Sequence, residues 1–176
     1  MQVCGGPKWT GPGRLERGKI PDPAMDFYLV RHGTARAEAE DPKRPLSDRG
    51  RWEVGEVARS AVAKGIQVSQ ILHSDKLRAK ETAEMLGRSL SPAEGVRETR
   101  GLSPEDDPWI AKAELEAAER SLMLVGHLPH LAKLASLLVT GDPEGGVIEF
   151  SPAAIVCLSR AGGKWEVSWA LAPLKT

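Results

Sequence analysis

Two arginines and two histidines are the residues of this sequence whose types and positions could do chemistry together. Arg31 and His32 directly follow the apolar run "FYLV". Arg78 lies in "HSDKLRAKETAEML", and His127 follows "SLMLVG". Guanidinium groups are permanent cations, and an imidazole can be a nucleophile or an N–H donor. Around one pocket these four side chains would select a dianion, provided that the fold brings their segments together.

Short apolar runs stand before each of these segments and predict strands. The runs "DFYLV" (26–30), "IQVSQIL" (66–72) and "SLMLVG" (121–126) are typical of buried strands. Near the C-terminus, "AAIVCLS" and "KWEVSWAL" flank "RAGG" and predict a hairpin.

Helical patterns fill the intervals between the predicted strands. After Ser47, a plausible N-cap, apolar residues recur on one face as far as Gly65, including Val62. Ser74 is interpreted as the cap of a second helix, over 75–90. A third helix is expected to begin at Pro108 and cover 108–120, and a fourth to end at Gly141.

This alternation predicts an α/β fold with three layers, a mostly parallel sheet covered by helices on both faces, and a C-terminal hairpin. Ligands of such sheets bind outside the carboxyl ends of the strands. Arg31 and His32, the pair His73 and Ser74, and His127 all follow predicted strands. We therefore expect them to share one edge of the sheet.

The sequence gives less support to other functions of these residues. Paired histidines could hold a metal, but two guanidiniums would repel a divalent cation, and no carboxylate or thiolate is obviously placed to help. The sequence contains no phosphate-binding loop or dinucleotide fingerprint. Taken singly, Arg31 and Arg78 could be solvated charges, and His32 and His127 partly buried histidines. Their combination is what favours an anion site.

Composition narrows the class of protein. The 176 residues fit one domain, and 24 Lys and Arg balance 24 Asp and Glu, so no global field favours nucleic acid or an anionic membrane. No apolar stretch is long enough for a membrane span. Cys4 and Cys157 form no disulfide framework, which favours a cytoplasmic location. Residues 1–24, rich in Gly and Pro, are expected to be a flexible extension before a domain at 25–176.

Three motifs, in order, resemble those of the histidine phosphatase superfamily, whose fold is phosphoglycerate mutase-like. "LVRHGTA" resembles its R-H-G signature, "HSDKLRAKETAEML" its S-x-x-x-R-A-x-x-T-A segment, and "LMLVGHLP" the strand that delivers a second histidine. The segment "RPLSDRG", the short middle region and "GHLP" resemble the SixA-type phosphohistidine phosphatases. The resemblance runs from about Met25 to the C-terminus.

The resemblance implies roles for particular residues. His32 would be the nucleophile that forms a covalent phosphohistidine, and Arg31, Arg78 and His127 would complete the catalytic phosphate pocket. Gly33 and Arg44 would contribute to substrate binding. Neither a metal nor another cofactor is implied.

The larger members of the superfamily carry an acid that protonates the leaving oxygen. The middle of this chain offers Glu98, Glu105, Asp106 and Asp107, and none can be assigned. An imidazole leaves more readily than an alkoxide without such an acid, so its absence favours a phosphohistidine substrate.

We therefore expect a metal-independent phosphatase acting on a phosphohistidine-bearing phosphorelay or phosphotransfer protein. One alternative is a small-molecule phosphomonoesterase that depends on one of the middle acids. The other is a non-catalytic module that binds phosphoproteins.

Overall fold

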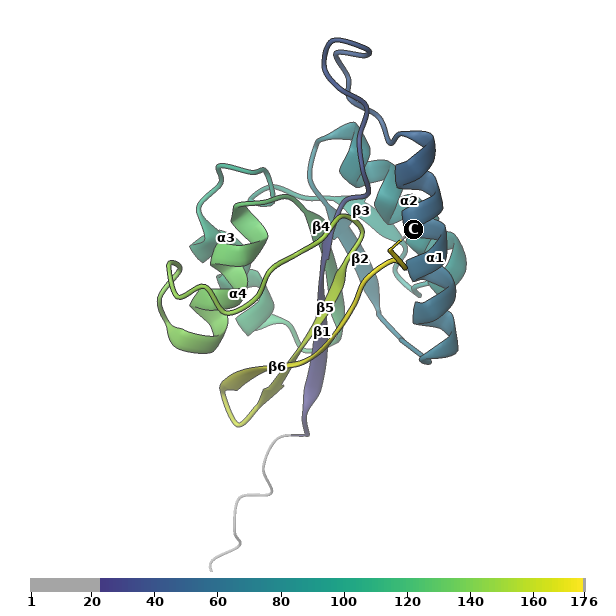
Figure 1. The fold of residues 1–176 in the computed structure, drawn as a ribbon. Helices are drawn as coiled ribbons and strands as arrows, with labels where there is room; N and C mark the ends of the chain where they lie inside the picture. Colours follow the sequence, from purple (N-terminus) through teal and green to yellow (C-terminus); the bar gives the residue numbers. More distant parts are fainter. Residues whose placement is uncertain (1–22, 176) are drawn as a thin grey trace, which may run out of the picture.

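A computed structural model describes residues 23–175, which form one mixed sheet with helices on both faces (Figure 1). The sheet order is β3-β2-β4-β1-β5-β6. The first four strands in this order are parallel, and β5 is antiparallel to both β1 and β6. The strands are β1 (Met25–Arg31), β2 (Gln70–His73), β3 (Val96–Glu98), β4 (Leu122–Gly126), β5 (Ile155–Ala161) and β6 (Lys164–Leu171).

Two helices cover each face of the sheet. The helices are α1 (Asp48–Ala63), α2 (Leu77–Leu90), α3 (Pro108–Ala117) and α4 (His130–Thr140). α1 and α2 lie on one side of the sheet, and α3 and α4 on the other (Figure 1). The predicted α/β class with three layers, a mostly parallel sheet and a C-terminal hairpin is confirmed. Within residues 23–175, no helix has the length and apolar character needed to span a bilayer.

Strand β1 shows why both faces must be covered. Its side chains alternate between two cores, because successive residues of a strand point to opposite faces. Tyr28 and Val30 pack in the core beneath α1 and α2. Phe27 and Leu29 pack in the core beneath α3 and α4. A strand buried on both faces is continuously apolar, which explains "FYLV".

Local sequence signals set three helix ends as predicted. Ser47 is the N-cap of α1, where its side chain accepts a hydrogen bond from the Gly50 amide. Pro108 opens α3 behind Asp107, whose carboxylate accepts from the Trp109 amide. α4 ends at Gly141, which has a left-handed φ of 79° that glycine adopts without strain.

Four local predictions were wrong, and one strand was missed. Strand β2 begins at Gln70, because residues 66–69 form an irregular connection, and α3 ends at Ala117 rather than at residue 120. Strand β3 was not predicted, since three residues at a sheet edge carry too short a pattern. Val62, expected on the buried face of α1, is 52% exposed near the end of that helix. Ser74 does not cap α2, whose N-cap is Lys76 with no side-chain capping bond.

The sheet order places three functional segments side by side. Parallel β4 lies between β1 and β2, so the carboxyl ends of these three strands are adjacent. Arg31 pairs in register with Gly126, and His73 with Val125. The residues that directly follow the three strands therefore meet at one edge. The predicted extension at 1–24 lies outside the described residues except for its last two.

Candidate active site

The predicted arginines and histidines do come together. The His32 amide donates to the Gly126 carbonyl over 3.1 Å, which fixes the end of β1 against the end of β4. The rings of His32 and His127 lie 4.9 Å apart between centroids, tilted by 54°. Arg78, from the first turn of α2, points its Nε toward His32 Nε2 over 3.4 Å. Two strand ends and the first turn of α2, which are distant in sequence, thus build one site.

His32 is held as a neutral ring with one unprotonated nitrogen. Its Nδ1 lies 2.6 Å from the Gly33 carbonyl oxygen, which can only accept, so Nδ1 carries the proton. Burial, together with the charges of Arg78, Arg31 and Arg44, lowers the pKa of His32 to about 4. At neutral pH the Nε2 atom therefore carries no proton and keeps the lone pair that a nucleophile needs, toward which Arg78 Nε points over 3.4 Å.

His127 is also neutral but differently bonded. Burial and the neighbouring His32, Arg78 and Lys76 lower its pKa to about 3. Its Nε2 lies 2.6 Å from the Ser74 hydroxyl. Its Nδ1 is buried and has no hydrogen-bond partner among the described residues.

The arginines supply charge within reach of a bound oxyanion. Arg31 donates from Nη1 to the Phe150 carbonyl over 2.8 Å, while its buried Nε has no partner among the residues described. Burial lowers the pKa of Arg31 and of Arg78, yet a guanidinium stays charged at any physiological pH. An unpaired buried donor costs free energy, and a phosphate oxygen would pair such a group.

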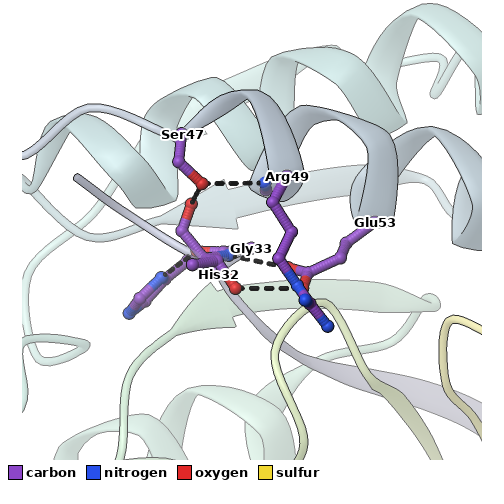
Figure 2. Close-up of polar contacts among 7 residues, drawn as sticks. His32, Gly33, Ser47, Arg49 and Glu53 are labelled. Carbon is purple, nitrogen blue, oxygen red and sulfur yellow. Dashed lines mark hydrogen bonds and ion pairs between the residues drawn. The ribbon is translucent and has the colours of Figure 1, made fainter. Parts of the chain in front are cut away.

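The loop after His32 is held by helix α1 (Figure 2). Glu53 is buried, and its carboxylate accepts from the Thr34 amide over 2.9 Å and from the Thr34 hydroxyl over 3.0 Å. Arg49 donates to the same carboxylate over 3.0 Å, which pairs the buried charge. The Ser47 hydroxyl donates to the Thr34 carbonyl over 3.0 Å. The nucleophile is therefore followed by a fixed segment of backbone.

Helix α2 holds the same loop from another side. Thr82 Oγ1 accepts from the Gly33 amide over 3.2 Å and donates to the Arg78 carbonyl over 2.8 Å. Glu81 accepts from the Leu46 amide over 2.6 Å. The segment "RAKETA" thus positions the nucleophile as well as supplying Arg78, a role of Glu81 and Thr82 that the sequence did not reveal.

Gly33 and Arg44 both lie at the site, with different relations to it. A Cβ atom on Gly33 would meet the Gly50 carbonyl at 2.8 Å, so the close approach is to α1. Both backbone polar groups of Gly33 bond to protein, and substrate binding by this residue stays a prediction. Arg44 donates to the Arg36 carbonyl over 3.3 Å, and its charge lowers the pKa of His32 and Arg78.

The candidate proton donors of the middle region have other partners or lie at the margin of the site. Asp106 accepts from the Ser103 amide over 2.9 Å, and Asp107 caps α3. Glu98 lines a side cavity, and Glu105 is exposed. The carboxylate whose charge acts to raise the pKa of His127 and of Arg78 is instead Asp75. The sequence did not single out Asp75, although it directly follows Ser74.

The donor groups do not assemble into a metal site. Within residues 23–175, no group of three or more His, Cys, Asp or Glu side chains is placed to hold a metal ion. His73 Nδ1 bonds to the Ser74 carbonyl at 2.7 Å. Independence from metal stays a prediction for experiment.

Comparisons with known proteins find similar sequences. The histidine phosphatase superfamily (branch 1) matches residues 27–103, which include Arg31, His32 and Arg78. An uncharacterized protein of Picosynechococcus sp. is 35% identical over 147 residues, covering 78% of this chain and 86% of that protein. The phosphohistidine phosphatase SixA of Escherichia coli is 28% identical over 152 residues, covering 82% of this chain and 94% of SixA.

The fold is shared with a solved structure as well. The protein histidine phosphatase SixA complexed with tungstate superposes with a TM-score of 0.75 at 26% identity. The match covers 85% of this chain and 97% of that one.

Proposed function

The chain belongs to the histidine phosphatase superfamily, in its SixA-type group, and from that premise we propose that it is a phosphohistidine phosphatase acting on a signalling or phosphotransfer protein. Phosphatase activity is common to this group. The observation that carries the mechanism is the His32 ring, protonated at Nδ1 by its bond to Gly33, with Nε2 facing Arg78. Catalytic roles for Arg31, Arg78 and His127 are part of the proposal.

In the first step, His32 Nε2 attacks phosphorus, and the bond between phosphorus and the substrate nitrogen breaks. The substrate ring carries a proton on its other nitrogen, so it keeps the electron pair and leaves as a neutral imidazole. The His32 ring, now phosphorylated at Nε2 and protonated at Nδ1, becomes a cation. The Gly33 carbonyl stabilises that cation, and Arg31, Arg78 and His127 bind the phosphoryl oxygens.

In the second step, water attacks the phosphorylated His32. The bond between phosphorus and Nε2 breaks, Nε2 recovers its electron pair, and inorganic phosphate takes up both protons of the water. The ring returns to its neutral state, with the proton still on Nδ1 and donated to the Gly33 carbonyl. Total charge is the same before and after each step, so neither step needs another reagent.

The carboxylates near the site support a phosphohistidine substrate rather than a phosphomonoester. An alkoxide leaving group needs a proton in the transition state, which a neutral carboxylic acid would supply. A hydrogen bond from Ser103 is the main cause that lowers the pKa of Asp75, so this carboxylate is ionised. Asp106 and Asp107 are engaged by backbone amides. A departing imidazole needs no such donor.

The surroundings of the site support a protein substrate. A cavity of about 410 Å³ opens beside Asp75, between the end of β3 and the start of α3. Ile110 lines it and is 54% exposed, and the neighbouring Trp109 is 53% exposed. Exposed apolar side chains beside a reactive centre fit contact with a protein surface. A cytoplasmic location, where such relays operate, belongs to the same proposal.

The test is single-turnover phosphate release from a phosphohistidine-bearing protein and from an alkyl phosphate, with and without a chelator. We expect rapid release from phosphohistidine alone, unaffected by the chelator, and a covalent phosphoenzyme that His32→Ala abolishes. Glu56→Ala, which removes an exposed ion pair on α1, serves as the control variant and should retain full activity.

Each alternative predicts a different result. Efficient release from the alkyl phosphate, lost in Asp75→Asn or in a variant of one middle acid, would indicate a small-molecule phosphomonoesterase. Binding of the phosphoprotein with no turnover would indicate a non-catalytic module. Loss of activity with the chelator would contradict metal independence.

A further inference from the structure

We propose that Ser74 is a positioning residue that keeps His127 in the tautomer with its proton on Nδ1, so that this N–H is available to a phosphoryl oxygen. The inference rests on the proposed function for the role of that N–H, but the tautomer itself is a property of the free protein. Ser74 would act through His127 and would not contact the substrate.

The first support is the geometry of the pair. Ser74 Oγ lies 2.6 Å from His127 Nε2, and each residue is only 1% exposed. The Ser74 amide donates to the Val125 carbonyl over 3.3 Å, and the His127 carbonyl accepts from the Leu131 amide over 2.9 Å. The backbone of each residue is thus fixed, Ser74 beside the end of β4 and His127 at the start of α4.

The second support is the choice of hydrogen-bond acceptors for the Ser74 hydroxyl proton. The Ser74 oxygen already accepts from the Lys76 amide over 3.3 Å. Among the described residues, His127 Nε2 is the acceptor within reach of the Ser74 hydroxyl proton. When the hydroxyl donates to Nε2, that nitrogen has no proton, and the single proton of the neutral ring sits on Nδ1.

The opposite tautomer leaves more groups unpaired. If Nε2 carried the proton and donated to Ser74, the buried hydroxyl proton would have no acceptor among the described residues. His127 Nδ1 would then be a bare acceptor facing a phosphate oxygen that also only accepts. Such a contact would repel the anion. The tautomer set by Ser74 therefore suits both the free protein and the bound dianion.

The tautomer of His127 is important because the ring is neutral. Because burial and nearby cations lower the pKa of His127 to about 3, the ring has one N–H at neutral pH, not two. A residue that selects which ring nitrogen bears this proton therefore decides whether His127 can donate a hydrogen bond to the ligand. Ser74 as a nucleophile is not supported, since within residues 23–175 no carboxylate contacts His127 Nδ1 to orient a serine-histidine pair.

The direct test is ¹⁵N NMR of the histidine rings in the full-length protein, with His127 assigned by comparison with His127→Gln. In the wild type we expect His127 to show a protonated Nδ1 and an unprotonated Nε2. Addition of inorganic phosphate should shift the Nδ1–H signal. A wild-type His127 protonated at Nε2 would overturn the proposal, and this readout depends on neither turnover nor a variant that folds.

Kinetics give the second test. We expect Ser74→Ala to mix the His127 tautomers and to slow phosphorylation of His32 about tenfold to hundredfold with little change in KM. Ser74→Thr, which keeps the hydroxyl, should recover most of the rate. Ser136→Ala is the matched control, because Ser136 is fully buried on α4 and accepts from the Val147 amide over 3.1 Å away from the site.

The outcomes separate the two proposals. If Ser74→Ala keeps the wild-type tautomer and rate, Ser74 does not set the ring and the inference is wrong. If the tautomer follows Ser74 but no phosphohistidine is turned over, the inference about the ring holds and the proposed function fails.

Discussion

At the scale of single residues, the site depends on keeping two histidines neutral beside permanent cations. Burial is the largest cause that lowers the pKa of both His32 and His127, and nearby positive charges add to it. For a nucleophile this shift is useful, because protonation of Nε2 would remove its lone pair. The Gly33 carbonyl opposes the shift only in part, since it stabilises the protonated ring.

A pH dependence follows from the pKa of His32. Because this pKa is about 4 rather than 6.5, the lone pair of Nε2 should be available down to about pH 5. We expect the single-turnover rate of His32 phosphorylation, corrected for titration of the substrate, to fall only near pH 4. Arg78→Gln removes a cation that disfavours the protonated ring, so it should move the fall to higher pH. A wild-type rate that falls near pH 6.5 would contradict this account.

At the scale of elements, helices α1 and α2 act as a clamp on the loop that follows the nucleophile. Ser47, Glu53 and Gly50 of the α1 segment meet Thr34, and Thr82 of α2 meets Gly33. An antiparallel bridge between residues 35 and 46 closes the base of this loop. The helices therefore position the phosphate site as well as cover the sheet.

Two glycines of α1 provide a matched test of this clamp. A Cβ on Gly50 would overlap the Thr34 carbonyl, whereas one on Gly55 would meet only the Arg59 side chain, at 3.7 Å. We expect Gly50→Ala to lower the free energy of unfolding by about 1 to 3 kcal/mol through overpacking. It should also reduce kcat, because Thr34 is two residues from the nucleophile.

Gly55→Ala should instead raise the free energy of unfolding by about 0.5 to 1 kcal/mol, as alanine does inside a helix, and leave kcat unchanged. Urea unfolding and kcat with a small phosphoramidate would measure both variants. Equal effects of the two substitutions would show that α1 does not clamp the loop.

At the scale of the whole molecule, the sheet order decides which surface surrounds the reactive centre. The carboxyl ends of β1, β2 and β4 carry the site, and the cavity lined by Asp75 and Ile110 lies beside it. α1 runs away from this edge (Figure 1), and Val62 is the second-last residue of that helix. Ile110, beside the site, and Val62, at the far end of α1, are thus comparable exposed apolar side chains.

A comparison of Ile110→Ala with Val62→Ala tests whether the edge beside the site contacts a protein substrate. The two side chains are β-branched and are 54% and 52% exposed. We expect Ile110→Ala to raise KM for a phosphohistidine-bearing protein about fivefold, which corresponds to about 1 kcal/mol of lost contact. KM for a small phosphoramidate should stay constant, and Val62→Ala should change neither value. Equal KM values for all three proteins would exclude Ile110 from the contact.

The sequence by itself determined the elements and the chemical types at the site. Within the part of the chain that the structure describes, periodicity and caps located every helix and five of the six strands, because burial on one face or on two leaves a repeating pattern. The rule for carboxyl ends of parallel strands is enough to place His32 and His127 at one edge from the sequence alone. Strand β3 was not predicted, because three residues at the edge of a sheet are too few to show a periodic hydrophobic pattern.

Only the tertiary structure decided how those residues work. The bond of His32 to Gly33, that of His127 to Ser74, and the bond that Glu53 accepts from Thr34 join atoms whose proximity depends on packing. Ser74 shows the limit of prediction from the sequence. A serine before a helix predicts a cap, but β4 brings His127 Nε2 within 2.6 Å of the Ser74 hydroxyl, and α2 is capped by Lys76 instead. The Ser74 oxygen keeps one local bond, from the Lys76 amide. Partners distant in sequence leave no periodic pattern, so only the folded chain reveals them.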